Sequence, residues 1–523
     1  MRTGTPAGAR RSDPTLTFRA SLNALAAFVD YGARAVVQLV LAPLLLRFLG
    51  DAGYGAWQVL QKLIGHTTPA GGRPGEALKW VVAQEQRNQS GDPADIARRR
   101  QQVGTAVAVW LLFLPLVAVL GAVLAWFAPA LVRVGADHVW TVRIAAGVLV
   151  LNTMVLGLAA IPQSVLVGAN LGYRRLGLST SILLFGGGLS ALTLWQGWGL
   201  IGVEAATTTT TVLSGVTYLH IVRGQIPWWG VRRPLRGAVR GFVGLSWWFL
   251  LWNLVMQLIK GSDVIVLSAV AGASVVTVYS LTSFIPQSVT DIVFMVVSAT
   301  MPGLGGLVGA GELDRASRIR SETMVLAWLV SVGSAATIIV WQPAFLRLWV
   351  GGKYDAGTTT TVLICVMVVQ LALIRVDSNV IDLTLRIQAK VLLGLFSAVL
   401  SAGLALALLL AAPDGLELPA LVAGFVLGRL PLTVAYPVLV GRLLARPRVI
   451  EPAALARPAF AMVLLGACAV WLRPFAVADH WFSLIALGSL SAGLLLLAAY
   501  AVGLSAAQRR SVRRRVLRVV RLA

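Results

Sequence analysis

The sequence has few charged residues, and few of those are acidic. Of its 523 residues only 12% are charged, with 44 Lys and Arg against 21 Asp and Glu, so the net charge is +23. Soluble domains carry about 25% charged residues. Because 57% of the residues are hydrophobic and the mean hydropathy is +0.80, the composition predicts a membrane protein with many spans.

Cysteine and histidine are also scarce. Cys365 and Cys468 lie in apolar runs, and the four histidines are scattered. This supports no disulfide framework, no metal site and no cofactor. The chain has no extramembrane segment long enough for a catalytic or nucleotide-binding domain, so we do not expect an enzyme. The arginines occupy short segments between apolar runs rather than a basic domain, so nucleic acid is not an expected partner.

Apolar segments long enough to cross a bilayer follow one another along the chain. About fourteen are found with a window of about nineteen residues: 19–49, 52–84, 104–128, 140–168, 177–197, 200–222, 240–270, 275–302, 321–342, 358–386, 390–412, 418–441, 458–476 and 482–505. Lys and Arg concentrate in every second connection, as they do in cytoplasmic loops. We therefore expect both termini to be cytoplasmic.

A repeat divides these spans into two halves. Gly50 precedes Trp57 by seven residues, Gly272 precedes Tyr279 by seven, and each glycine follows a long span with a polar stripe. Internal repeats are common in transporters. The predicted organisation is a basic cytoplasmic N-terminus (1–18), an N-lobe of six spans (19–222), a cytoplasmic linker (223–239), a C-lobe of six spans (240–441), two more spans (458–505) and a basic cytoplasmic tail (506–523).

The first span carries a line of polar residues. Asn23, Asp30, Arg34 and Gln38 are seven, four and four residues apart, so they share one helix face. Asp30 and Arg34 are placed to neutralise each other. Ionisable residues inside a membrane cost at least about 2.5–3.5 kcal/mol, so this face should contact protein or a water-filled cavity.

The second span is interrupted by prolines and glycines between Pro69 and Gly75. These residues cannot continue an α-helix. A half-helix beginning near Pro74 would present free N–H groups and a positive dipole end, which with Arg73 suits an anion such as a pyrophosphate. In the alternative reading, this stretch is an interfacial loop and Arg73 is solvated.

Two later spans repeat the polar theme. Asn253, Gln257 and Lys260 share a face of the seventh, with Asp263 three residues further on. A pair between Lys260 and Asp263 would be a structural alternative to substrate contact. Adding the tenth span, the candidate substrate-binding residues are Arg34, Arg73, Lys260, Asn253, Gln257 and Arg375. The candidates for charge pairing or ion coupling are Asp30, Asp263 and Asp377.

Four segments resemble polysaccharide and O-antigen flippases of the multidrug/oligosaccharidyl-lipid/polysaccharide exporter superfamily. They are LRFLGDAGYGAWQVL (46–60), IPQSVLVGANLGYRR (161–175), SDVIVLSAVAGASVVTVYSL (262–281) and MPGLGGLVGAGELDRA (301–316). The chain departs from the family at PAGGRPGEALKW (69–80), so no ion-coupling residue is carried over. The lipid II flippase branch of this superfamily uses cavity arginines in its first spans. Arg34 and Arg73 are of the same type, and they are not matched to those arginines position by position.

The resemblance implies an all-α membrane fold with two pseudo-symmetric six-helix lobes around a central cavity and two C-terminal helices. The implied function is alternating-access translocation of undecaprenyl-pyrophosphate-linked oligosaccharide across a bacterial plasma (inner) membrane, for cell-surface polysaccharide synthesis. Expected partners are the lipid-linked glycan, membrane lipids, and a polysaccharide polymerase and glycosyltransferases. The alternatives are an ion-coupled drug or metabolite antiporter of the same superfamily, a membrane polysaccharide polymerase or ligase, and a non-transporting envelope scaffold.

Overall fold

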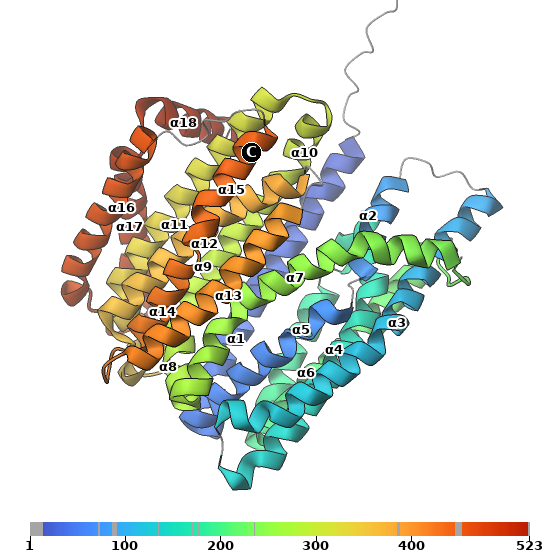
Figure 1. Ribbon diagram of the computed structural model, residues 1–523, viewed down its shortest axis with the longest axis horizontal. Coiled ribbons are helices and arrows are strands. Elements are labelled where there is room, and N and C mark those ends of the chain that lie inside the picture. Colours follow the sequence, from blue (N-terminus) through green and yellow to red (C-terminus); the bar gives the residue numbers. More distant parts are fainter. Residues whose placement is uncertain are drawn as a thin grey trace, which may run out of the picture. The chain divides into compact units, whose positions relative to one another are not determined.

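The computed structural model describes residues 14–71, 74–85, 92–133, 135–169, 171–175, 177–234, 236–383, 388–444 and 452–520 (Figure 1). Within these ranges every regular element is helical, and no strand occurs. The all-α membrane fold predicted from the sequence is therefore confirmed.

The α-helices are α1 (Pro14–Gly65), α2 (Pro74–Glu85), α3 (Pro93–Val132), α4 (Val139–Gly168), α5 (Leu178–Trp195), α6 (Gly199–Gln225), α7 (Arg236–Ala271), α8 (Ala273–Thr282), α9 (Phe284–Ala299), α10 (Met301–Gly309), α11 (Leu313–Trp349), α12 (Gly357–Leu383), α13 (Gln388–Ala411), α14 (Glu417–Gly428), α15 (Leu430–Leu443), α16 (Pro452–Leu472), α17 (Trp481–Ala498) and α18 (Ala506–Val520). Short 3₁₀ turns are η1 (Thr68–Gly71), η3 (Ala136–His138), η4 (Gly172–Arg175), η5 (Gly352–Tyr354) and η6 (Arg473–Phe475), and η7 (Ala499–Gly503) is a π-helix.

Eleven of the described helices are long and apolar enough to cross a membrane, or twelve if α8 and α9, which are bent by 53°, form one span. The predicted count of fourteen is not confirmed. One reason is that α1 covers the first predicted span and the start of the second, with a kink at Gly50, where the backbone is not helical. The other is that α6, which contains five consecutive threonines, is not among the eleven.

The contacts divide the chain into two compact units. Unit 1 comprises Met1–Leu49, Ile64–Pro129 and Ala136–Leu250, and unit 2 comprises Gly50–Leu63, Ala130–Gly135 and Leu251–Ala523. The lobe and linker boundaries expected from the sequence stay a prediction.

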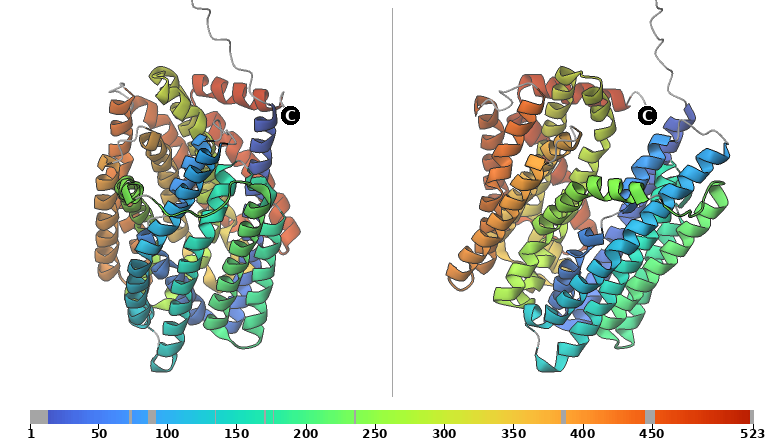
Figure 2. Two further views of the ribbon diagram at one scale, coloured as in Figure 1. Left: turned by 90° about the vertical axis from the view of Figure 1, so that its right-hand side faces the viewer. Right: turned by 45° about the vertical axis from the view of Figure 1, so that its right-hand side comes forward.

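Unit 1 is built from helices that run side by side, with α4 packed against α2 and α6, and α5 packed against α6 (Figure 2). Its core includes Leu78, Val165 and Val222. In α6, Thr207–Thr211 each donate a hydroxyl hydrogen bond of 2.7–3.0 Å to the carbonyl four residues earlier. This satisfies the threonine hydroxyls inside an otherwise apolar helix.

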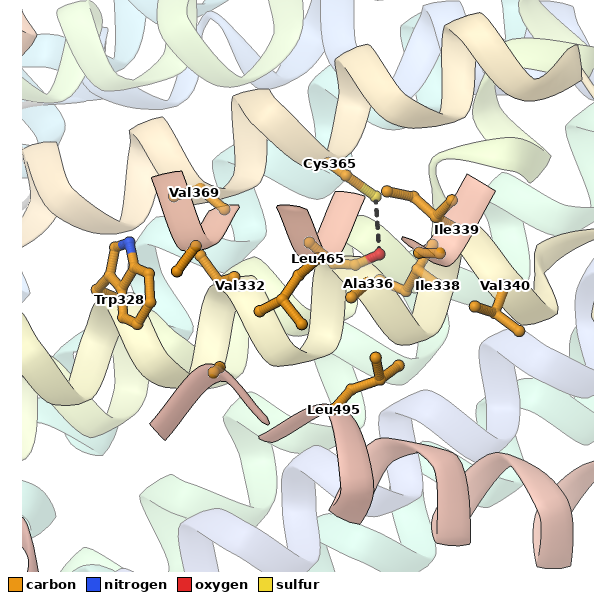
Figure 3. Packing of buried hydrophobic residues seen from close by; sticks show 14 of the residues in the cluster. Trp328, Val332, Ala336, Ile338, Ile339, Val340, Cys365, Val369, Leu465 and Leu495 are labelled. Carbon is orange, nitrogen blue, oxygen red and sulfur yellow. Dashed lines mark hydrogen bonds between the residues drawn. The ribbon is translucent and has the colours of Figure 1, made fainter. Parts of the chain in front are cut away.

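Unit 2 is centred on α11, which contacts α9, α12, α16 and α17. Trp328, Val332 and Ile339 of α11 pack with Val369 of α12 and Leu465 of α16 in a buried cluster (Figure 3). The last two predicted spans are apolar because α16 and α17 pack against α11 within this unit.

The predicted interruption of the second span is present. The first helix ends at Gly65, η1 follows, and α2 begins at Pro74. At Gly75 a β-carbon would lie 2.8 Å from Ser164 Oγ and 3.1 Å from the Ala160 carbonyl oxygen of α4. The glycine therefore permits the start of α2 to pack closely on α4.

Candidate functional site

A cluster of charges surrounds one aromatic ring in unit 2. Lys260 Nζ of α7 lies 4.9 Å from the centroid of the Phe294 ring of α9. The Arg375 guanidinium of α12 lies 5.0 Å from the same centroid. The structure thus brings together two cations that lie far apart in the sequence, and the electron-rich ring stabilises both. We call Lys260, Asp291, Phe294 and Arg375 the Phe294 cluster.

The ion pair in this cluster joins Lys260 to Asp291. The distance from Lys260 Nζ to Asp291 Oδ1 is 3.3 Å, and the two side chains are 35% and 42% exposed. Gln287 donates a second hydrogen bond to the same carboxylate oxygen at 3.3 Å. Exposed pairs of this kind contribute only about 0–1 kcal/mol, so a ligand anion could replace Asp291 as the partner of Lys260 at little cost.

The structural alternative, a pair between Lys260 and Asp263, does not form. Asp263 instead accepts a hydrogen bond of 2.6 Å from Tyr279 Oη of α8. The two residues are three apart on a helix, but α8 and α9 supply closer partners for both. Asn253 and Gln257, the other polar candidates on α7, are half-buried.

A small cavity adjoins the cluster. Its volume is about 20 Å³, and its lining includes Trp252 of α7, Phe294, Arg375 and Arg429. Arg429, on the turn between α14 and α15, is 1% exposed and donates to the Ile259 carbonyl at 2.6 Å. A volume of this size holds about one water molecule. The cavity therefore lies between several helices of unit 2 and is too small for a saccharide.

Asp377 is paired elsewhere in unit 2. Its carboxylate accepts two hydrogen bonds from Arg320 of α11, at 2.6 and 2.8 Å. The Arg320 and Asp377 side chains are only 7% and 1% exposed. This bidentate pair joins α11 to α12 and leaves no carboxylate surface free for a substrate.

In unit 1, Asp30 does not pair with Arg34 as predicted. Its carboxylate accepts hydrogen bonds from Ser179 at 2.8 Å and from Thr180 at 3.1 Å, and lies 3.5 Å from Arg175. The start of α5 therefore supplies polar partners that the spacing on α1 did not reveal.

Arg34, the other charged candidate on α1, is exposed. Arg73, the remaining candidate, lies outside the described residues.

A second polar group lies beside the bend of α1. Asp51 accepts hydrogen bonds from Tyr354 Oη at 2.5 Å and from Lys353 Nζ at 3.0 Å. Hydrogen bonds to Tyr354 and Asp51 raise the pKa of Lys353. Burial and the hydrogen bond to Asp51 raise the pKa of Tyr354. The group holds η5 to the bend, and Thr277 Oγ1 of α8 adds a 2.6 Å bond to the Asp51 carbonyl.

Several residues of these clusters were not singled out from the sequence. Asp291 and Arg429 lie inside predicted apolar spans. A charged residue in such a position indicates a functional or paired group, so the sequence alone could have pointed to both. Arg320 directly precedes the predicted span 321–342 and Lys390 is the first residue of the span 390–412, positions typical of loop charges, but both are buried. Phe294 carried no signal, because an aromatic residue in an apolar span is ordinary.

No protein-family model matches the chain, and no curated protein matches it significantly. Several solved structures do match the chain. The lipid II flippase MurJ in an inward closed conformation has a TM-score of 0.66 at 10% identity, over 91% of this chain and 98% of its own. An inward-facing multidrug resistance MATE family transporter of the MOP superfamily has a TM-score of 0.59 at 14% identity, over 79% of this chain and 94% of its own. The chain has the fold of MOP superfamily transporters.

A further MOP superfamily transporter, from Pyrococcus furiosus, has a TM-score of 0.56 at 15% identity over 83% of this chain and 97% of its own. These three neighbours are transporters or flippases. Together with the apolar helices, the MOP fold identifies a multi-pass membrane protein.

Proposed function

We propose that this MOP-fold protein is a flippase that moves an undecaprenyl-pyrophosphate-linked oligosaccharide across a bacterial plasma membrane by alternating access. The observation that carries the proposal is the extent of the structural match. The lipid II flippase aligns with 91% of this chain, against 79–83% for the MATE and Pyrococcus transporters above. The match thus takes in more of this chain's helices.

The Phe294 cluster supplies the chemistry that a pyrophosphate needs. Lys260 is accessible and is held by an exposed carboxylate, so it can exchange Asp291 for a phosphate oxygen. Arg375 contributes a second positive charge, 5.0 Å from the centroid of the same ring. The lipid tail of the substrate would stay in the bilayer while its charged head passes through the protein.

The competing function is an ion-coupled drug or metabolite antiporter. It is favoured by sequence identity, which is 14% with the inward-facing MATE transporter and 10% with the flippase. An antiporter of cationic drugs would need a carboxylate free to bind the drug, and Asp291 is the exposed acidic residue of the cluster. The two functions therefore predict opposite roles for the same ion pair.

Purified protein in proteoliposomes separates them. The flippase function predicts transfer of a fluorescent pyrophosphate-linked saccharide lipid that Lys260→Arg retains, Lys260→Gln reduces and Lys260→Glu abolishes. Lys353→Gln is the matched control, because Lys353 is also an exposed lysine paired with an aspartate, outside the Phe294 cluster. If Lys260→Glu transfers the lipid as well as the parent protein, the cationic mechanism is wrong. Ethidium export that depends on Asp291 would instead support the antiporter.

A further inference from the structure

Lys390 is a fully buried ammonium group near the start of α13. Its side chain is 0% exposed, and its Nζ lies 2.6 Å from Asp382 Oδ1 in the last turn of α12. The same nitrogen lies 3.6 Å from the centroid of the Trp252 ring of α7. Tyr436 of α15 donates a 3.0 Å hydrogen bond to the Lys390 carbonyl, which fixes the backbone at this point. Four helices therefore meet at one lysine.

The two members of the ion pair differ in their access to water. Asp382 is 34% exposed while Lys390 is not exposed at all. Among the described residues, the second charged group that acts on this lysine is Arg375, a cation that opposes the ammonium group, so Asp382 is the carboxylate that balances it. A buried ammonium group has lost its hydration and depends on such a partner. Asp382 is therefore both the counter-ion of Lys390 and its connection to solvent.

The lysine is also connected to the candidate substrate site. Trp252, which lies under the ammonium group, lines the small cavity together with Phe294 and Arg375. One turn after Lys390, a β-carbon at Gly394 would lie 2.7 Å from Val255 Cγ1 and 3.1 Å from the Trp252 ring. α13 and α7 are therefore in close contact one turn after Lys390, and α7 is the helix that also carries Lys260.

We propose that Lys390 and Asp382 form a proton-transfer site that couples proton movement to transport. The Lys390 N–H bond breaks, the proton passes to an Asp382 carboxylate oxygen and from there to water, and the nitrogen keeps the electron pair. The neutral amine no longer attracts the Trp252 ring or the carboxylate. The contact between α7, α12 and α13 is then weakened, and reprotonation restores it. The inference rests on the proposed function, because it names the energy source for that transport.

The test uses the full chain in proteoliposomes with a fluorescent pyrophosphate-linked saccharide lipid and an entrapped pH-sensitive dye. The parent protein should transfer the lipid faster when a pH gradient is imposed. Lys390→Arg keeps the positive charge but cannot release a proton, so its transfer rate should be the same with and without the gradient. Asp382→Asn should show the same loss. Lys353→Arg, at an exposed lysine, is the matched control and should respond as the parent does.

If Lys390→Arg responds to the gradient as fully as the parent, or if the parent does not respond, the proton-transfer site is overturned. If the lipid is not transferred by any of these proteins, the proposed function fails. Proton coupling is then tested with ethidium as the transported probe, and the entrapped dye measures the proton movement. Ethidium-driven proton movement in the parent that is absent from Lys390→Arg supports the site under the antiporter function. Equal movement in both overturns it.

Discussion

Gly50 and Gly272 adopt nearly the same backbone conformation, with φ and ψ of 70° and −178° at Gly50 and of 82° and 174° at Gly272. Gly50 bends α1, and Gly272 separates α7 from α8. Residues with a side chain rarely reach this region of φ/ψ space. The repeat of glycine and aromatic residue noticed in the sequence thus marks two equivalent bends.

Replacing either bend glycine should strain the backbone. No heavy atom lies within 4 Å of a β-carbon at Gly50 or Gly272, so the expected loss of about 1–3 kcal/mol for Gly50→Ala or Gly272→Ala comes from φ/ψ alone. Thermal unfolding of the purified protein in detergent measures it. Gly32→Ala, on α1 with equally open space and no positive φ, is the control and should be neutral or stabilising. An equal loss in all three would contradict the conformational explanation.

Gly55 is required for a different reason. A β-carbon there would overlap the carbonyl oxygen of Ala273, at the start of α8. Gly55→Ala should therefore destabilise the protein by about 1–3 kcal/mol through steric overlap. Gly65→Ala, on the same helix with no atom within 4 Å, should not. A similar unfolding temperature for the two variants would mean that α1 and α8 can move apart to accommodate the methyl group at little cost in stability.

Element positions were more predictable than side-chain partners. The predicted spans 140–168 and 390–412 correspond to Val139–Gly168 and Gln388–Ala411, because long apolar runs with turn residues between them leave few alternatives. The interruption of the second span was likewise predictable, since proline and glycine cannot continue a helix.

The ion pairs were not predictable, because each partner comes from a distant segment. Spacing alone pairs Lys260 with Asp263, whereas the structure selects Asp291, which is 31 residues away. Spacing also pairs Asp30 with Arg34, whereas Arg175 and the hydroxyls of α5 take that role. A single sequence shows which helix face is polar but not which helix lies opposite to it.

The buried pair of Arg320 and Asp377 should behave as a unit. Arg320→Met leaves an isolated carboxylate with 1% exposure and should cost about 3–5 kcal/mol. The double variant Arg320→Met, Asp377→Leu removes both charges and should recover most of that loss. Denaturant unfolding of both variants in detergent measures the difference. If the folded double variant no longer transports, the charges of this pair have a role in transport beyond stability.

Arg175 and Arg34 should differ in their effect on stability. Arg175→Ala removes the ion-pair partner of Asp30 and should lower the free energy of unfolding by about 1 kcal/mol or more. Arg34→Ala leaves the hydrogen bonds from Ser179 and Thr180 to Asp30 intact, so the free energy of unfolding should change by less than about 0.5 kcal/mol. Its transport of lipid-linked saccharide should nevertheless fall if Arg34 contacts the substrate. Equal destabilisation by both substitutions would support the pair between Asp30 and Arg34 that was expected from their spacing on α1.

Membrane topology tests whether α6 crosses the bilayer. The predicted spans place seven crossings between Ser90 and Gly352, so cysteines introduced singly at these positions should be labelled from opposite sides. Ser90 lies outside the described residues, and Gly352 is exposed in η5. The background should carry Cys468→Ser, because Cys468 is exposed, whereas Cys365 is buried. An impermeant maleimide, applied before and after permeabilisation, gives the side of each. If α6 does not cross, one crossing is lost and both positions are labelled from the same side. That outcome would contradict a six-span N-lobe.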